Sequence, residues 1–558
     1  MSERPPGGSL TARLDDLVLY QAYPQSFADG NGDGIGDLIG LRERLDYLCW
    51  LGVDAVWLNP CFVSPFRDAG YDVADYLQVA PRYGSNDDLV ALCEAAAERG
   101  IGIVLDLVAG HTSDEHPWFR QACKEDADPA DRDRYLWSPL PKDGWVQAPG
   151  DQQRWYLPNF LPFQPALNYG YARPNADEPW RQPVDAPGPR RNREALKQIM
   201  AFWFDRGVSG FRVDMAASLV KDDIDLAQTR RLWGELRAWV DQRYPGRLLI
   251  AEWGDPSLSV PAGFHVDMFL HFGGADNGLP LRSLWQNGGG TVSDYWPDYP
   301  CWADADGGGS LEVFATAWRQ AREAISASSG YGLGGVAGLP TANHDFSRLV
   351  AGGRDAEQAR VALTLVFTWA TMPCLYYGDE IGLPYRPGLA PFEGSRLEPR
   401  FERAGSRTPL PWGDLAATDF AATTTTARYL AVDAAAGAPT VAGQYRDPDS
   451  LLAFVRTLIG LRHQDRRLAA SAPLRLIAGG SPAAYLRGED ESLLVVLNPA
   501  RRATTLSWSL VGDAAVEDRR SSSVVVVGRG VRLGEEAIEV DGFGYAVIEV
   551  KPERPSDE

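Results

Sequence analysis

The chain has 558 residues, more than a single hydrophobic core usually accommodates, so two or three domains are expected. Its content of 45% hydrophobic and 23% charged residues is typical of a globular protein. The net charge of −21 excludes the cationic surface that nucleic acids or anionic membranes require, and it favours a neutral substrate.

The six cysteines show no metal-ligand spacing, which predicts reduced thiols and a cytoplasmic location. The first residues, MSERPPGGSL, lack the apolar region of a signal peptide. Residues 361–378 carry no charge, but Pro373 divides them and Asp379 follows them. This pattern predicts a buried helix and strand rather than a membrane span.

Two hydrophobic periods alternate through the first part of the chain. Three apolar runs are expected to form strands: residues 18–24, 53–60 and 101–108. Between them, helices are expected from about Leu38 to Leu48 and from Ser85 to about Ala96, each followed by a glycine. Continuous apolar strands that alternate with helices predict a parallel sheet covered on both faces.

The alternation stops after His111 and resumes with a helix near 193–206. The later strands are expected at residues 208–214, 247–253, 265–272, 338–345 and 372–380. The total of eight favours a closed (β/α)8 TIM barrel of the α/β class over an open sheet.

Three domains follow from this pattern. The barrel is expected to comprise residues 1–111 and 189–465, with an extension at about 383–447, and residues 112–188 to form an inserted subdomain after strand 3. Residues 466–558 contain LLVVLNP, SSVVVVG and GYAVIEV, which predict a C-terminal β-sandwich.

Acidic residues stand where four of the expected strands end. These are Asp106, Asp214, Glu252 and Asp345. In a barrel all such ends open on one face, so the four side chains are expected to converge. Glycoside cleavage needs one ionised and one protonated carboxyl group. Arg212 lies two residues before Asp214, so both point to the same side of the strand, where the guanidinium would keep Asp214 ionised.

Several motifs are similar to those of one known family. They are YQAYPQSFADGNGDGIGDL, GVDAVWLNP, DAGYDVADY, DLVAGHTSDEHPWF, GFRVDMA, AEW, NHDFSR, YYGDEIG and SRTPLPW. Their residues and order resemble the α-amylase family of glycoside hydrolases, in its branch of oligo-1,6-glucosidases, α-glucosidases and trehalose synthases. The resemblance covers Leu19 to about Trp412.

The resemblance implies roles for particular residues. Asp214 would be the nucleophile, Glu252 the general acid/base, and Asp345 the third carboxylate that binds sugar hydroxyls in the transition state. Substrate-binding roles would fall to Asp68, Tyr71, His111, Arg212, His344 and Arg348, with the two histidines donating to the sugar before the cleaved bond and Tyr71 stacking against it.

A loop after the first strand carries oxygen-bearing residues at alternating positions: Asp29, Asn31, Asp33, Ile35 (through its carbonyl) and Asp37. They match the start of a calcium-binding loop, although Gly40 replaces the expected bidentate Glu. Because the resemblance implies a site here, a structural Ca²⁺ is expected over a simple acidic turn, and no organic cofactor is expected.

Three residues depart from the family pattern. Gly110 replaces the usual Asn, Ala166 replaces a common Asp, and Met215 matches neither linkage-associated residue. Three functions remain open: a retaining hydrolase of short α-glucosides, a glucosyltransferase or trehalose-synthase-type isomerase with the same catalytic residues, and a catalytically silent binding protein. The retained carboxylates favour the first two.

Overall fold

The computed structural model describes residues 9–151, 153–173, 175–271, 280–285, 301–329, 334–389, 393, 403–413, 430, 437–512 and 523–550. Phe272, at the end of one expected strand, and much of the expected extension at 383–447 lie outside these ranges. Among the described residues, no helix is long and apolar enough to cross a membrane. All six cysteines are free thiols.

Eight parallel strands close into a barrel, as the sequence predicts. In spatial order the barrel is β1-β13-β12-β11-β10-β9-β5-β2. The strands are β1 (Leu19–Ala22), β2 (Ala55–Leu58), β5 (Gly102–Val108), β9 (Gly210–Asp214), β10 (Leu248–Ala251), β11 (Val266–Met268), β12 (Val336–Pro340) and β13 (Met372–Tyr376).

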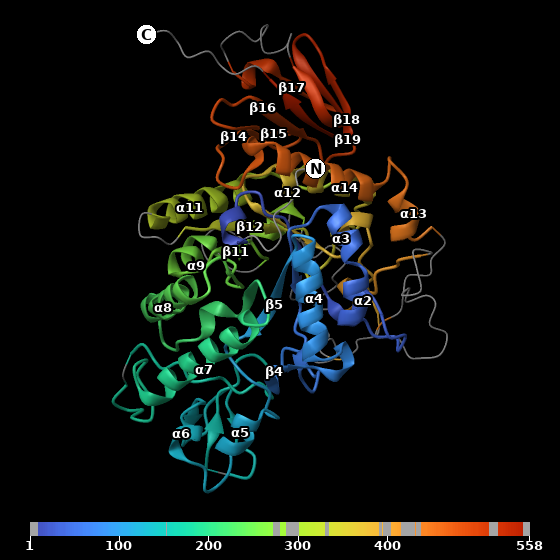
Figure 1. Ribbon diagram of the computed structural model, residues 1–558. Coiled ribbons are helices and arrows are strands. Elements are labelled where there is room, and N and C mark those ends of the chain that lie inside the picture. The colour runs from blue at the N-terminus through green and yellow to red at the C-terminus, as the bar shows by residue number, and fades with distance from the viewer. Residues whose placement is uncertain are drawn as a thin grey trace.

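Helices cover the outside of the barrel (Figure 1). They are α2 (Leu38–Glu43), α3 (Leu45–Leu51), α4 (Asn86–Glu98), α7 (Pro187–Phe204), α8 (Ala227–Arg243), α9 (Pro256–Ala262), α11 (Glu312–Ser329), α12 (Ala356–Thr368) and α14 (Leu451–Gln464). Shorter helices are α1 (Pro24–Phe27), α10 (Pro280–Leu284) and α13 (Val441–Tyr445).

One expected helix is divided in two. The backbone of Arg44, at φ −98° and ψ 6°, leaves the helical conformation between α2 and α3, so the apolar spacing from Leu38 to Leu48 continues across a break. The start of α4 is as predicted, because Ser85 and Asp88 form a reciprocal capping box.

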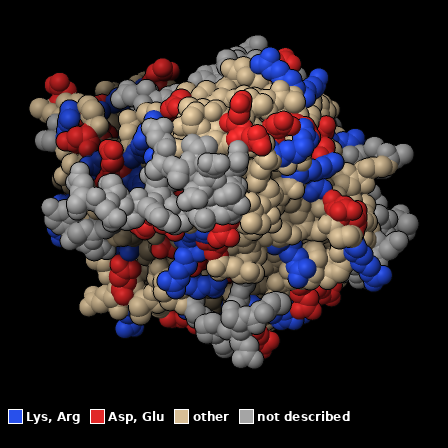
Figure 2. Space-filling view, turned by 90° about the horizontal axis from the view of Figure 1, so that it is seen from above, with Lys and Arg blue, Asp and Glu red and all other residues tan. Residues whose placement is uncertain are grey.

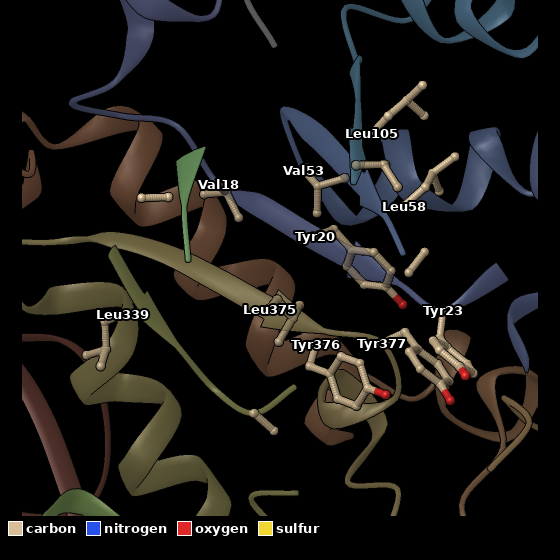
Figure 3. Packing of buried hydrophobic residues seen from close by; sticks show 14 of the residues in the cluster. Val18, Tyr20, Tyr23, Val53, Leu58, Leu105, Leu339, Leu375, Tyr376 and Tyr377 are labelled. Carbon is tan, nitrogen blue, oxygen red and sulfur yellow. The ribbon is translucent and has the colours of Figure 1, made fainter. Parts of the chain in front are cut away.

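Alternating side chains of the strands build two cores. Val18, Tyr20 and Leu58 face the helices, and Figure 3 shows them with other buried residues around β1. Leu19, Ala55 and other residues of the opposite parity fill the barrel interior. The polar residues of this inner face, Asp106 and Arg212 among them, come later along their strands. The apolar interior therefore supports a polar layer at the carboxyl end of the barrel.

The segment between β5 and α7 contains its own small sheet. Strands β6 (Trp137–Ser138), β8 (Trp155–Tyr156) and β7 (Val146–Gln147) pair in that order, near helices α5 (Pro117–Ala122) and α6 (Pro129–Arg132). In Figure 1 this segment lies at the end of the molecule opposite the C-terminal sheet. A hairpin of β3 (Phe62–Val63) and β4 (Asp75–Val79) precedes it in the chain.

The C-terminal part is an antiparallel β domain. Its strands are β14 (Leu474–Gly479), β15 (Ala483–Arg487), β16 (Leu493–Leu497), β17 (Thr504–Ser507), β18 (Val524–Leu533) and β19 (Ala537–Glu549). They form one hydrogen-bonded sheet in which the long β19 pairs with β17 through its first part, with β16 through its last part, and with β18. Side chains of β15, β16, β17 and β19 form a separate apolar core. The limits expected for the three domains stay predictions.

Candidate active site

A pocket of about 400 Å³ opens among residues that follow the carboxyl ends of the barrel strands. Its lining residues are Asp68, Tyr71, His111, Phe160, Asp214, Met215, Ala217, Ser218, Glu252, Trp253, His271, Asp345, Phe346 and Arg403. The three predicted catalytic carboxylates therefore share one cavity, together with Asp68, Tyr71 and His111. Barrel closure brings them together from positions far apart in the chain.

Arg212 is the hub of the carboxylate cluster. Its Nη1 donates to Asp106 Oδ1 at 2.8 Å and to Asp214 Oδ1 at 3.0 Å, and its Nη2 lies 2.5 Å from Glu252 Oε1. The backbone N–H of Met215 donates to Glu252 Oε2 at 2.9 Å. Asp214 and Glu252 are thus both held by the same guanidinium. Arg212 itself lies beneath the pocket, buried, and does not line it.

Burial dominates the electrostatics of Asp214. Desolvation raises the pKa of its carboxyl group well above the usual value, the neighbouring Glu252 raises this pKa further, and Arg212 lowers it. The expected effect of Arg212 has the right sign but is outweighed by burial. Asp106 behaves similarly, since burial raises its pKa to about 6 against the influence of Arg212. Asp214 and Asp106 therefore bind protons more readily than exposed carboxyl groups do.

Asp345 lies in the opposite electrostatic environment. Burial alone would raise the pKa of its carboxyl group, but Arg403, His344, Arg407 and Arg212 together hold this pKa far below its usual value. Arg403 Nε and Arg407 Nη2 approach Asp345 Oδ1 at 3.2 Å and 3.1 Å. Asp345 is therefore ionised throughout the working pH range and is suited to accept hydrogen bonds from sugar hydroxyls.

His344 and Tyr71 form a fixed polar wall. Tyr71 Oη lies 2.8 Å from His344 Nε2 and donates to Asp106 Oδ2 at 3.1 Å, while Gln21 Nε2 lies 3.0 Å from His344 Nδ1. The Tyr71 and His344 rings stack with centroids 5.4 Å apart. Burial lowers the pKa of His344 to about 3, so the ring is neutral. Tyr71 lines the pocket, whereas His344 contacts Tyr71 and does not itself line the pocket.

Asp68 is anchored beside Asp345 by a shared cation. Arg403 Nη1 lies 3.3 Å from Asp68 Oδ1, and Gln164 Nε2 donates to Asp68 Oδ2 at 2.8 Å. Arg348, predicted to shape the same subsite, is fully buried away from the pocket lining. Its guanidinium donates to the carbonyl oxygens of Tyr377 at 2.5 Å and Ser406 at 2.8 Å, so it supports the loop that carries Arg407.

Sequence reasoning missed several residues of the pocket: Phe160, Trp253, His271, Phe346 and Arg403 as contact residues. Arg403 is the most consequential, because it joins two of the predicted site carboxylates. Its signal was available but weak: it lies four residues before Arg407 of the quoted SRTPLPW motif. Nothing in a segment without periodicity indicates which arginine turns inward.

The predicted calcium loop is built from its own backbone hydrogen bonds. Asp29 accepts from the N–H groups of Gly32 and Gly34 at 2.7 Å and 2.8 Å. Asp37 accepts from Gly30, Asn31 and Gly40. Asn31 and Asp33 accept from the backbone two residues on. In the described part of the chain, no three His, Cys, Asp or Glu side chains are grouped as metal ligands.

The closed barrel and its strand-end carboxylates define a (β/α)8 glycosidase. Comparison with known proteins agrees, since residues 21–260 and 302–471 match the family model described as alpha amylase, catalytic domain. The chain belongs to the α-amylase family, as its motifs predict, and is an enzyme of the glycosidase class.

Its relatives include enzymes of several specificities. The chain is 30% identical over 519 residues to the trehalose synthase/amylase of Mycolicibacterium smegmatis, covering 84% of this chain and 79% of that protein. It is 29% identical over 563 residues to the oligo-1,6-glucosidase of Heyndrickxia coagulans, covering 88% and 94%. The crystal structure of the trehalulose synthase MutB from Pseudomonas mesoacidophila superposes with a TM-score of 0.74 at 25% identity, covering 96% and 99%.

Proposed function

We propose that this protein is a retaining α-glucosidase that hydrolyses short α-glucosides through a covalent glycosyl-enzyme. The observation that carries the proposal is the joint anchoring of Asp214 and Glu252 by Arg212 at the carboxyl end of the barrel. Both carboxyl groups contact one guanidinium, Asp214 Oδ1 at 3.0 Å and Glu252 Oε1 at 2.5 Å, so they lie side by side. Adjacent carboxyl groups favour a retaining mechanism, because an inverting enzyme needs a wider gap to admit a water between its base and the sugar.

Each carboxyl group has a role in this proposal. Asp214, the last residue of β9, attacks the anomeric carbon, and Glu252 donates its proton to the leaving glycosidic oxygen. The leaving group then departs, Glu252 takes a proton from water, and that water attacks the glycosyl-enzyme. Asp345, kept ionised by Arg403 and Arg407, binds sugar hydroxyls most strongly in the transition state.

The crowded carboxyl groups of the free enzyme explain where the proton that Glu252 donates comes from. Asp106, Asp214 and Glu252 face a single guanidinium, and burial raises the pKa of Asp214, so Asp214 holds a proton at a pH where isolated carboxyl groups are ionised. A sugar that enters between Asp214 and Glu252 brings its anomeric carbon to one group and its glycosidic oxygen to the other, and the pair then divides into base and acid.

Stereochemistry tests the mechanism without knowledge of the natural substrate. With an aryl α-glucoside, two inversions predict that NMR detects the α anomer of glucose first, before mutarotation. An added alcohol should divert part of the glycosyl-enzyme into an α-glucoside. A β anomer appearing first would overturn the nucleophilic role of Asp214.

A second candidate function is transfer or isomerisation by the same residues. It is favoured by relatives named trehalose synthase and by a structural neighbour named trehalulose synthase. The pocket walls also contain Phe160, Trp253 and Phe346, aromatic surfaces against which an acceptor sugar can stack. Incubation with maltose, isomaltose and sucrose, followed by product identification, separates the two functions: monosaccharides alone (glucose, with fructose from sucrose) support hydrolysis, and a new disaccharide supports transfer.

We propose further that Ca²⁺ binds the loop of Asp29 to Asp37. The donors offered there are carboxylate, amide and carbonyl oxygens, which Ca²⁺ prefers, and an oxygen that accepts one N–H keeps a second lone pair. Burial raises the pKa of Asp37, a cost that a bound cation would offset. A ligand of the folded state raises the melting temperature, so a chelator should lower it and Ca²⁺ restore it. An unchanged melting curve, with no metal found by elemental analysis, would remove this site.

A further inference from the structure

All three departures from the family pattern meet at one place beside the pocket. Gly110 precedes His111, Ala166 pairs with His111 in an isolated antiparallel bridge, and Met215 lines the pocket next to Asp214. Gly110, His111 and Met215 share the side chain of Asn159 as a neighbour. Its Nδ2 lies 3.2 Å from His111 Nδ1 and 3.5 Å from Met215 Sδ.

Gly110 provides the space that Asn159 occupies. A Cβ atom at position 110 would lie 2.8 Å from Asn159 Nδ2, closer than non-bonded atoms approach. The backbone at Gly110 has no positive φ that would require glycine. The Asn159 amide therefore fills the space that a side chain at position 110 would need, so the two positions are complementary.

Asn159 belongs to a loop whose side chains contact two residues of the pocket, His111 and Asp68. Its backbone N–H donates to the carbonyl of Gln164 at 2.9 Å, which closes the loop. From the same loop Gln164 donates to Asp68, and Phe160 lines the pocket. The loop thus supports the site at two polar points, His111 and Asp68.

The hydrogen bonds around Asn159 determine which way its amide points. Lys221 Nζ donates to Asn159 Oδ1 at 3.2 Å and also to the carbonyl of Ser218. An ammonium group has no acceptor, so the amide oxygen must face Lys221 and the NH₂ group must face His111. The NH₂ donates to His111 Nδ1, which therefore carries no proton.

The same reasoning determines the tautomer of His111. Burial lowers the pKa of His111 to about 3, so the ring carries one proton, and that proton must be on Nε2. Nε2 lies 3.2 Å from the carbonyl oxygen of Tyr71, an acceptor that agrees with this assignment. If the amide were reversed, its NH₂ group would face the Lys221 ammonium, donor against donor. Its oxygen would then require the His111 proton on Nδ1, which would leave unprotonated Nε2 facing the Tyr71 carbonyl oxygen, acceptor against acceptor.

We propose that Asn159 is a positioning residue that supplies, from a different part of the chain, the amide missing at position 110, and that it holds His111 as the Nε2–H tautomer facing the pocket. His111 can then share this single N–H, which faces the Tyr71 carbonyl oxygen at 3.2 Å in the free enzyme, with a sugar hydroxyl in a three-centre hydrogen bond. The sugar-binding part rests on the proposed function; the tautomer does not.

The first experiment is ¹⁵N NMR of the full-length protein labelled at histidine, without substrate. The six histidines give few signals, and His111→Gln assigns the one in question. Wild type should show an unprotonated Nδ1. Asn159→Asp replaces the donor by an acceptor, so it should move the proton to Nδ1. Asn86→Asp, the same change on α4, should leave the His111 signal unchanged. Retention of the wild-type tautomer in Asn159→Asp would overturn the proposal.

The second experiment is a double-mutant cycle on aryl α-glucoside hydrolysis. Gly110→Ala should displace the Asn159 amide and lower kcat/KM by about 10- to 100-fold, as a misplaced positioning contact does. With Asn159→Ala already present, the added Cβ meets no amide, so Gly110→Ala should cost less than about twofold. Independent, multiplicative effects would refute the link between the two positions. Wild-type kcat/KM in both Gly110→Ala and Asn159→Ala, with the proton of His111 still moved to Nδ1 in Asn159→Asp, would disprove the sugar contact alone.

Discussion

Asp214→Asn should make the protein more stable while it removes the activity. The ionised carboxyl is part of a cluster in which Asp106, Asp214 and Glu252 share Arg212. An amide of the same shape can still accept from Arg212, and its NH₂ can donate to Glu252. The substitution therefore keeps the packing and relieves a repulsion between buried like charges.

The size of the effect follows from the same cluster. Burial raises the pKa of Asp106 from 3.8 to about 6, and two pKa units correspond to about 3 kcal/mol against the ionised form. Relief of one unfavourable site typically stabilises a protein by about 0.5–2 kcal/mol. We expect Asp214→Asn to raise the free energy of unfolding by about 1–3 kcal/mol at pH 8 and to lower turnover on the order of 10⁴-fold.

The pH dependence gives the reasoning a sharper test. Since folding raises the pKa of Asp214, the wild-type protein is penalised only where this carboxyl loses its proton in the unfolded chain. The penalty begins near pH 4, where the unfolded carboxyl group ionises, and grows until the pH passes the folded-state pKa. The difference in melting temperature between Asp214→Asn and wild type should therefore be larger at pH 8 than at pH 5.

Scanning calorimetry at several pH values measures this difference. Asp46→Asn is the control, because Asp46 is 83% exposed and its ion pair with Arg99 is worth little. It should change neither activity nor the pH trend. If Asp214→Asn were inactive but no more stable than wild type, or if its added stability were the same at every pH, the proposed repulsion among Asp106, Asp214 and Glu252 would be refuted.

Two further predictions concern residues outside the catalytic pair. Arg403→Gln should lower kcat/KM at every pH, because Arg403 is the strongest of the cations that lower the pKa of Asp345 and it also contacts Asp68; Arg403→Lys should restore kcat/KM in part, and an unchanged kcat/KM would exclude this role. His116→Gln tests linkage: burial lowers the pKa of His116 to about 3, so the wild-type protein loses stability as the pH falls below about 6.5, where the unfolded histidine takes up a proton. Urea unfolding of the glutamine variant should show a pH slope smaller by up to about 1.4 kcal/mol per pH unit between pH 6.5 and 4. Equal slopes would contradict it.

The sequence by itself determined the barrel and the positions of its carboxylates. Apolar strands alternate with helices, and this pattern arises from burial on both faces of a parallel sheet, so it can be read locally. Asp214 and Glu252 stand at or just after strand ends, and closure of the barrel places all such residues on one face. The motifs around them identified the family, which the comparisons confirm.

Tertiary structure decided what the loops and the charges do. Arg403 and Asn159 come from segments without hydrophobic periodicity. Arg403 contacts Asp68, 335 residues away in the chain, and Asn159 contacts His111, 48 residues away. Arg348, in a quoted motif, turned out to donate to backbone carbonyls away from the pocket. The pKa of Asp214 likewise depends on burial, which outweighs the adjacent Arg212. Desolvation and contacts across the fold are set by the packing of distant segments, and no local pattern records them.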